Sequence, residues 1–356
     1  MTQLEALARI EAFRRRRPRL RDEVITMSHG AGGKASATLT DAIFLEAFRN
    51  PALEQLGDAA VLDPPDGPRL AFSTDSYVVK PLLFPGGSIG HLAVHGTVND
   101  LAVSGAIPRW LSAAFVLEEG LPIETLRTVV ADMQAAAVEA EVEIVTGDTK
   151  VVPRGAADGM YVTTSGVGLV RPEITLGANQ VRPGDAVLLS GPMGRHGTAV
   201  MLARDELAVQ ADITSDTAAL NGIIGDLLSA VPHTRWMRDA TRGGVATVCN
   251  ELAQSTQLAV VLDEAALPIP AEVAAVGDLL GIDPLYVANE GMFVAVVPAD
   301  AADVALATLR AHPLGRQAAV VGRIRADPAG VVALRTLYGG SRIVDMLVGD
   351  PLPRIC

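Results

Sequence analysis

The fold class can be argued from one stretch, Val142-Glu143-Ile144-Val145-Thr146-Gly147-Asp148-Thr149-Lys150. Its first four residues predict a strand that ends in Gly-Asp-Thr, a common place for metal and phosphate ligands. Before it, the apolar stripe of Pro122 to Ala140 predicts a helix with proline in its first turn. Strands are also predicted at Trp110 to Leu117 and at Tyr161 to Val170. Strands that follow one another closely favour an α+β fold over a regular doubly wound sheet.

Helices and strands are predicted on both sides of this region. Those before it are a helix over Thr38–Arg49, apolar strands at Ala59–Leu62 and Leu70–Ser76, and a helix capped by Ser88 that runs to about Ser104. Those after it are strands at Ala186–Ser190, Leu258–Leu262, Met292–Val297 and Ala318–Ile324, and helices from Thr198, over Leu220–Val231, around Cys249 and over Ala299–Ala311. The pattern changes near residues 171–183, which predicts a domain boundary there.

Composition excludes several classes of function. The chain has 356 residues and a formal charge of −12, so it is a poor candidate for general nucleic-acid binding. No apolar run is long enough to span a bilayer, and no secretory signal is visible, so we expect no membrane association. Two cysteines fit a reducing, cytoplasmic setting. The basic run Arg14–Arg17 is either the solvated end of a helix over Leu4–Phe13 or a contact arm for an acidic partner.

A glycine-rich stretch, Ser28-His29-Gly30-Ala31-Gly32-Gly33-Lys34-Ala35-Ser36, is a candidate anion-binding loop. Consecutive amides in such a loop can point at a nucleotide phosphate. It is not a P-loop, because Ala35 replaces the required Ser or Thr. On this stretch alone a flexible linker is an equally good interpretation.

Five aspartates stand at turns or in apolar surroundings: Asp58, Asp75, Asp100, Asp148 and Asp239. Gathered carboxylates repel one another unless a cation lies among them, and Mg²⁺ takes oxygen ligands and bridges phosphates. Together with the glycine loop, the set favours an ATP-dependent enzyme over a simple binding module.

Histidines and cysteines give weaker signals. His91, His95 and Asn99 share one helix face, but Leu92 replaces the glutamate of the zinc-protease motif, so zinc is disfavoured. For His91 and His95, core packing and contact with a nucleotide both stay open. Cys249 lies on the apolar side of its helix and is predicted to be buried and inert. Cys356 follows Pro353-Arg354-Ile355, and such an extended arm could carry a covalent group between sites.

Several motifs together resemble those of the HypE family, the carbamoyl dehydratases of [NiFe]-hydrogenase maturation, within the superfamily of aminoimidazole ribonucleotide synthetase and selenophosphate synthetase. They are His29–Lys34, Gly57–Val61, Ser73–Asp75, Asn99–Asp100, Gly147–Val152, Arg238–Gly244 and the final Pro-Arg-Ile-Cys. The acid motifs are typical of the whole superfamily. Within it, Gly-Asp-Thr-Lys-Val-Val and the terminal Pro-Arg-Ile-Cys resemble the HypE family in particular. It covers the chain from about residue 22.

The resemblance implies a two-domain fold like that of aminoimidazole ribonucleotide synthetase. We expect an extension over 1–21, an ATP-binding and dimerisation domain over 22–172, a second domain over 173–335 and a mobile tail over 336–356. ATP would lie at the interface of a homodimer. Four acids (Asp58, Asp75, Asp100 and Asp239) would hold magnesium with Asp148 close by. The nucleotide would be bound by Gly30, Gly32, Gly33, Lys34, Asn99, Thr149 and Lys150.

The resemblance also implies a reaction. A HypF-type transferase would carbamoylate Cys356, the tail would enter the ATP site, and phosphorylation followed by loss of phosphate would leave a thiocyanate. Lys150 and Glu290 match positions proposed for proton transfer in the family. Glu290 can act directly as a base, whereas Lys150 would have to be unprotonated, and otherwise contacts phosphate or orients the carboxamide. Cyanide would pass to iron on a HypC–HypD complex.

Two other kinds of function stay open on the sequence. A selenophosphate synthetase would carry a reactive cysteine near the glycine loop, but no cysteine precedes Cys249, and a thiamine-monophosphate kinase gives no reason for Cys356. A non-enzymatic scaffold could bind nucleotide and present the tail to partners, and only turnover that depends on the tail would exclude it.

Overall fold

The computed structural model describes residue 20 and residues 22–204, 211–347 and 354–356. The helix predicted over Leu4–Phe13, the basic run and Pro353 lie outside the described residues. Among the helices that are described, none has the length and apolar character needed to cross a membrane.

The first half of the chain forms a five-stranded mixed sheet with the order β1-β2-β7-β5-β6. Its strands are β1 (Ala60–Leu62), β2 (Leu70–Tyr77), β5 (Ala106–Glu118), β6 (Glu143–Val152) and β7 (Met160–Val170). Helix α5 (Ile123–Glu139) connects β5 to β6, and these two strands pair in parallel, as such a crossover requires. The other pairs are antiparallel. A short hairpin of β3 (Leu83–Phe84) and β4 (Gly87–Ser88) leads into the next helix.

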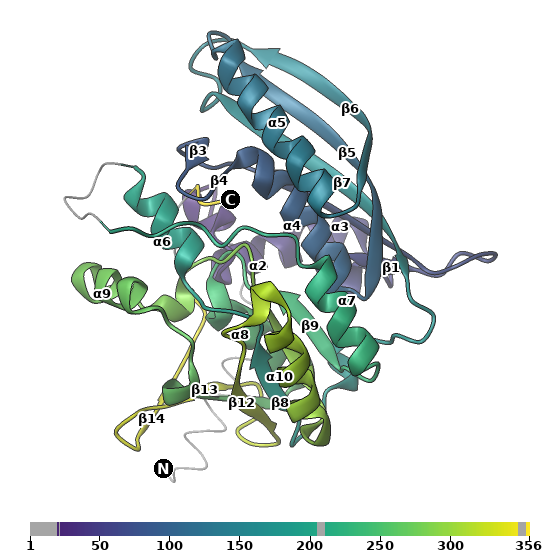
Figure 1. The fold of residues 1–356 in the computed structure, drawn as a ribbon, viewed down its shortest axis with the longest axis vertical. Helices are drawn as coiled ribbons and strands as arrows, with labels where there is room; N and C mark the ends of the chain where they lie inside the picture. The colour runs from purple at the N-terminus through teal and green to yellow at the C-terminus, as the bar shows by residue number, and fades with distance from the viewer. Residues whose placement is uncertain (1–19, 21, 205–210, 348–353) are drawn as a thin grey trace.

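Helix α4 (Ile89–Val103) is the central helix, covered on nearly all sides. Ser88 caps it by accepting a hydrogen bond from the Gly90 amide. Gly90 and Gly96 allow close packing, because a Cβ there would lie 2.3 Å from the Val129 carbonyl oxygen or the Tyr77 hydroxyl. A helix apolar all round is expected to be buried, and α4 lies between the first sheet and the second half of the molecule (Figure 1).

The second half forms a seven-stranded sheet with the order β14-β13-β10-β12-β8-β11-β9. Its strands are β8 (Ala186–Leu189), β9 (Trp236–Asp239), β10 (Ala259–Asp263), β11 (Phe293–Val297), β12 (Ala319–Arg325), β13 (Val332–Arg335) and β14 (Ser341–Ile343). Its helices are α6 (Arg195–Leu202), α7 (Asn221–Ala230), α8 (Gly244–Thr256), α9 (Ala271–Leu280) and α10 (Ala302–Ala311).

Both faces of the second sheet are buried, because alternate residues of a strand point to opposite faces. Val187 and Leu189 pack with α8, whereas Ala186 and Leu188 pack with α7 and α10. A further core shared by both halves joins α4 and α5 to α6 and α9.

The N-terminal segment and the connections are helical in short pieces. The segment combines η1 (Met27–Gly30), α2 (Lys34–Leu39), the π-helical turn η2 (Thr40–Leu45), α3 (Glu46–Phe48) and η3 (Leu53–Gln55). Single 3-10 turns are η4 (Ala178–Gln180), η5 (Glu264–Ala266), η6 (Pro284–Tyr286), η7 (Ala299–Ala301) and η8 (Pro313–Gly315).

The α+β prediction is confirmed, and two local predictions are wrong. Thr146–Lys150 was expected to follow a strand, but it continues β6, because β5 pairs with it as far as Val152. Asp239 was expected in a turn, but it is the last residue of β9, paired with Phe293. The helix α9 and the strands β13 and β14 have no counterpart among the predicted elements.

Candidate functional site

Three carboxylates meet where the two sheets approach each other. Asp58 precedes β1, Asp100 lies near the end of α4, and Asp239 ends β9. One oxygen from each lies within 4.8 Å of the others, and within the described residues this acid trio is the group suited to hold a metal ion. Helix α4 packs against both β2 and β9, so the contact between the two halves brings the trio together.

Burial makes the acid trio electrostatically unfavourable without a cation. It raises the pKa of Asp100 well above its ordinary value, and repulsion from Asp239, Asp58 and Asp75 adds to this effect. The pKa of Asp239 is also raised well above its usual range, by burial and then by Asp58. The donor set therefore fits a divalent cation, because carboxylate oxygens are preferred by Mg²⁺ and its charge would relieve this repulsion.

Two neighbours hold the acid trio in place. Arg238 Nε donates to Asp58 Oδ1 at 2.5 Å, and its Nη1 donates to Glu251 at 2.5 Å. The Ser73 hydroxyl donates to Asp100 Oδ2 at 2.5 Å. Asp58 thus already has a cationic partner, and burial raises its pKa although Arg238 opposes the shift.

A second group of charges is centred on Arg242, at the start of α8. The negative charge at Cys356 raises the pKa of the Arg242 guanidinium, and Asp75 and Glu290 act in the same direction. Asp75 lies on β2, outside the three-residue metal group, and burial raises its pKa although Arg242 opposes the shift. Arg242 therefore connects the end of the tail with two acids that the sequence assigned to the site.

Glu290 is 3% exposed, and its Oε1 has no hydrogen-bond partner within the described chain. Burial raises the pKa of this carboxyl well above its ordinary value, and Asp239, Asp216 and Asp75 add to the shift. Asp216 holds the turn that carries Glu290, because its carboxylate accepts the amides of Glu290 and Gly291 at 3.2 and 3.1 Å.

Asn99 also supports this turn. Its Nδ2 donates to the carbonyls of Ala218 and Glu290 at 3.1 and 3.4 Å, and its Oδ1 accepts from the Leu220 amide at 2.8 Å. The Asn99 side chain is buried, and both its amide nitrogen and its oxygen are hydrogen-bonded within the chain. Asn99 therefore positions the Glu290 turn, in addition to the nucleotide contact that the sequence predicted.

The predicted phosphate loop lies next to Arg242. Arg242 Nη1 donates to the Gly30 carbonyl at 3.3 Å, and Gly32, with φ of +73°, approaches the Arg242 backbone so closely that a Cβ would lie 3.1 Å from its carbonyl oxygen. The Lys34 amide donates to the Leu347 carbonyl at 3.0 Å, and its ammonium pairs with Asp345 at 2.7 Å. The chain leading into the tail thus covers Gly33 and Lys34.

Asp148, Thr149 and Lys150 do not join the acid trio within one chain. They lie exposed on β6, the far edge of the sheet, where Lys150 pairs with Asp148 at 2.5 Å. Three strand spacings separate β6 from β2, or about 14 Å. Asp148 pairs with Ala114, on the sheet face opposite to Ala113 and Asp75. These residues reach an acid trio only if a second chain supplies them.

The end of the tail is docked between the two halves of the molecule. Ile355 is 3% exposed and packs in the shared core, and Cys356 is half-buried against the same core. Arg354 pairs with Asp158 at 2.8 Å. Figure 1 shows the C-terminus beside the β3–β4 hairpin and α6.

His91, His95 and Cys249 lie outside the acid trio. His95 is buried and bonds to the Thr217 hydroxyl at 3.0 Å, and His91 lies near Asp132 at 3.7 Å. Neither belongs to the metal group found among the described residues. Cys249 is fully buried, as predicted, and burial raises the pKa of its thiol to about 12, which disfavours the reactive thiolate.

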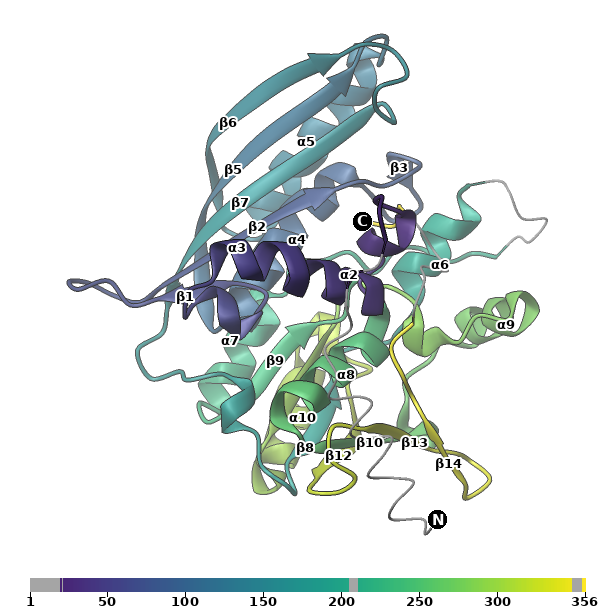
Figure 2. The same cartoon turned by 180° about the vertical axis from the view of Figure 1, so that it is seen from behind.

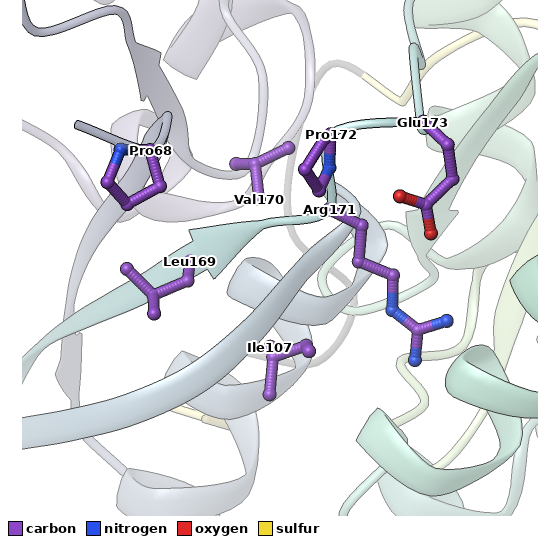
Figure 3. Close-up of a pocket in the computed structure, with 7 residues that line it drawn as sticks. All are labelled: Pro68, Ile107, Leu169, Val170, Arg171, Pro172 and Glu173. Atoms are coloured by element: carbon purple, nitrogen blue, oxygen red, sulfur yellow. The ribbon is translucent and has the colours of Figure 1, made fainter. Parts of the chain in front are cut away.

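A hollow of about 390 Å³ lies elsewhere, where the chain leaves β7 for the second half (Figure 3). Its lining is Pro68, Ile107, Leu169, Val170, Arg171, Pro172 and Glu173. It contains none of the residues that gather around the acid trio or Arg242. We therefore assign the chemistry to the junction of the two sheets.

Sequence reasoning missed three supporting residues: Arg242 as a centre of charge, Asp216 under the Glu290 turn, and His196 beside the tail. Arg242 stood in a quoted motif, which was the available signal. Asp216 and His196 could not be found, because their partners lie 74 and 159 residues away in sequence.

Comparison with known proteins gives the family. Residues 56–170 match the family described as AIR synthase related protein, N-terminal domain, and residues 182–335 match its C-terminal domain. The chain is 53% identical over 340 residues to carbamoyl dehydratase HypE of Rhodobacter capsulatus. The aligned region covers 95% of this chain and 99% of that relative. The chain belongs to the HypE family. The resemblance inferred from the sequence motifs is therefore confirmed.

Solved HypE structures share the fold. A HypE–HypF complex superposes with a TM-score of 0.82 at 43% identity, over 87% of this chain and 99% of that one. A HypE structure in complex with ATP gives a TM-score of 0.78 at 47% identity, over 94% and 100% of the two chains. The two-domain architecture expected for the HypE family is thereby confirmed.

Proposed function

We propose that the chain is an ATP-dependent dehydratase that converts an S-carbamoyl group on Cys356 into a thiocyanate. The observation that carries this proposal is the docked end of the tail: Ile355 is buried in the core shared by the two halves, Cys356 packs against that core, and the charges of Cys356, Asp75 and Glu290 all act on Arg242. The tail is thus held beside the acids assigned to the nucleotide site, as an intramolecular substrate requires. Membership of the HypE family supports the same reaction, and a HypE relative is known in complex with ATP.

The reaction balances as two steps. The carboxamide oxygen attacks the γ-phosphorus of ATP, the bond to the bridging oxygen breaks, and ADP leaves while the nitrogen loses one proton. The carbon–oxygen bond then breaks, phosphate leaves, and the nitrogen loses its second proton to give a sulfur-bound nitrile. Phosphorylation is needed because an amide oxygen is otherwise a poor leaving group.

The acid trio would hold Mg²⁺, and Asp75 lies near enough to Asp100 and Asp239 to affect their pKa values. When bound, the ion supplies charge neutralisation for the phosphoryl oxygens. The Gly30–Lys34 loop is proposed to cover the phosphates, which requires Lys34 to exchange its Asp345 partner for them. Arg242 would orient the substrate end of the tail from its place beside Cys356.

Glu290 and Lys150 are the two candidates for accepting the protons that the nitrogen loses. Burial and the neighbouring acids raise the pKa of Glu290, which favours the neutral carboxyl, whereas nearby cations would lower this pKa and favour the carboxylate that acts as a base. Lys150 is exposed on β6 and would have to come from a second chain. Both assignments are predictions, as are those of Asp148, Thr149 and Asn99 toward the nucleotide.

We propose a homodimer because the first sheet has an open face. Helices α4 and α5 cover one face, whereas Figure 2 shows no described helix over the upper part of the other. A row of paired residues crosses this face from Phe72 through Val167 to Trp110, and both aromatic side chains are 45% exposed. Apolar surface of this kind is typical of an interface.

Further partners follow from the family. A HypF-type transferase would load Cys356, since a HypE relative is known in complex with HypF. An iron-carrying HypC–HypD complex would accept the cyanide. Cys249 and Cys356, the proposed carrier, are not joined by a disulfide, which fits a reducing cytoplasm.

Mass spectrometry of the C-terminal peptide tests the reaction. The full chain is incubated with a HypF-type transferase, carbamoyl phosphate and Mg-ATP, and the peptide should gain one carbamoyl group and then lose one water. Without ATP the water loss should not occur. Buried Cys249 serves as the internal control and should stay unmodified. Cyanide delivery by a Cys356→Ala chain would refute the proposal.

A further inference from the structure

His196 connects the tail to the body of the protein. It lies in the first turn of α6, it is fully buried, and its Nε2 lies 2.9 Å from the carbonyl oxygen of Ile355. Its ring packs edge-on against Phe84 of the β3–β4 hairpin, with ring centroids 5.5 Å apart. The imidazole therefore contacts the peptide group that joins Ile355 to Cys356.

A chain of hydrogen bonds fixes which nitrogen carries the proton. The Thr217 amide donates to the Ser215 hydroxyl at 3.1 Å, and that oxygen lies 2.8 Å from His196 Nδ1. With the hydroxyl donating to Nδ1, the proton of the neutral ring lies on Nε2, where it can be donated to Ile355. Burial lowers the pKa of His196 to about 4, so the ring is neutral near pH 7.

Another group of contacts holds the tail one residue farther back, at Arg354. The Arg354 carbonyl accepts from the Lys80 amide at 3.3 Å and from Arg204 Nη2 at 2.7 Å, and its guanidinium pairs with Asp158. These contacts hold Arg354, whereas the bond from His196 acts on the peptide that leads directly into Cys356. A hydrogen bond at that peptide limits rotation of the segment that carries the sulfur.

We propose that His196 is the positioning residue that fixes the register of the docked tail, so that the group carried by Cys356 faces Arg242 and the acids. The proposal rests on the proposed function for its catalytic consequence, but not for the docking itself. His196 bonds to main chain, so it holds the tail equally well when the sulfur is free, carbamoylated or converted to thiocyanate. It touches no reacting atom, and its effect is on geometry.

Digestion of the full chain by a carboxypeptidase measures docking directly. When the tail is released and docks again faster than it is cleaved, the rate of digestion is proportional to the fraction of chains whose tail is released. His196→Leu should raise the release of Cys356 and Ile355 about fivefold, as expected for a lost buried hydrogen bond. His196→Gln keeps an N–H donor and should restore most of the protection. Ser215→Ala removes the group that fixes the proton and should give a smaller increase. Equal digestion of the His196→Leu and wild-type chains would overturn the proposal.

His95→Leu is the matched control. His95 is also buried and bonded to this loop, at Thr217, but among the described residues no hydrogen bond joins it to the tail. It should lower overall stability without raising release of Cys356. If His95→Leu exposes the tail as much as His196→Leu, the effect is general loosening and the proposal fails.

Single-turnover dehydration of the pre-carbamoylated chain gives the second readout. His196→Leu should slow the step about tenfold at saturating ATP and leave the ATP concentration for half-maximal rate unchanged. An unchanged rate despite a released tail would refute the positioning role. If the wild-type chain does not dehydrate at all, the proposed function fails, while the digestion result still decides whether His196 holds the tail.

Discussion

Asp100 is the residue at which burial and charge conflict most directly. It lies in the last turn of an almost entirely buried helix, close to Asp58 and Asp239, with Ser73 as its hydrogen-bond donor. Its pKa is higher in the folded chain than in the unfolded chain. As the pH rises from the unfolded pKa to the folded pKa, ionisation of Asp100 therefore lowers the free energy of unfolding. Such an arrangement is retained at sites where a cation binds.

Asp100→Asn should therefore stabilise the metal-free chain while weakening magnesium binding. The amide keeps the shape and removes one buried charge, which should raise the free energy of unfolding by about 1–3 kcal/mol near pH 7. Thermal unfolding with and without Mg-ATP measures both effects, and the stabilisation by Mg-ATP should be largely lost. The control is Asp278→Asn, whose side chain is exposed on α9 outside the candidate site. A less stable metal-free Asp100→Asn chain would contradict the electrostatic account.

At the scale of elements, the turn before β11 places Glu290. Asp216 accepts both amides of this turn, and Asn99 on α4 donates to the Glu290 carbonyl. The fit is so close that a Cβ on Gly291 would lie 1.7 Å from the Asp216 carbonyl oxygen. Any side chain at residue 291 must therefore displace the turn.

Gly291→Ala should lower both stability and activity. The overlap is with backbone, so the turn has to move, at a cost of about 2–4 kcal/mol, and Glu290 moves with it. Chemical denaturation and the rate of tail dehydration measure the two losses. Gly222→Ala in α7 is the matched control, because a Cβ there lies 3.5 Å from its nearest neighbour, His312. An equal effect of the two substitutions would show that the close packing at Gly291 has no special role.

Local patterns predicted these elements where the chain itself supplies the signal. The Ser88 cap, the apolar α4 and the stripe of α5 all follow from short-range periodicity. Thr146–Lys150 was misjudged because its pairing with β5, a long-range contact, extends the strand. The acids were recognised from their residue type and surroundings, whereas Arg242, Asp216 and His196 depend on contacts that only the folded chain creates.

At the scale of the whole molecule, the acid trio and β6 lie on opposite edges of the first sheet. A polar row, Thr74–Ser165–Ser112, lies beside the apolar row on the open face, and Ser165 donates to Thr74 at 2.9 Å. A second chain packed on this face would bury the exposed aromatic residues. It could also bring Lys150 of one chain to the acid trio of the other.

Mixing two inactive variants tests this arrangement. Lys150→Ala and Asp100→Asn chains should each be inactive alone, yet a mixed dimer contains one site with both an intact acid trio and an intact Lys150. Random pairing makes half of the dimers mixed, so activity should return to about a quarter of the wild-type value. The variants are mixed under conditions that allow subunit exchange, and dehydration of the carbamoylated tail is measured. Trp110→Glu in both chains places a charge on the open face and should abolish both the recovery of activity and the proposed dimer, as measured by sedimentation. If the mixture stays inactive while mixed dimers form, Lys150 acts within its own chain or not at all, and β6 would have no part in the partner's site.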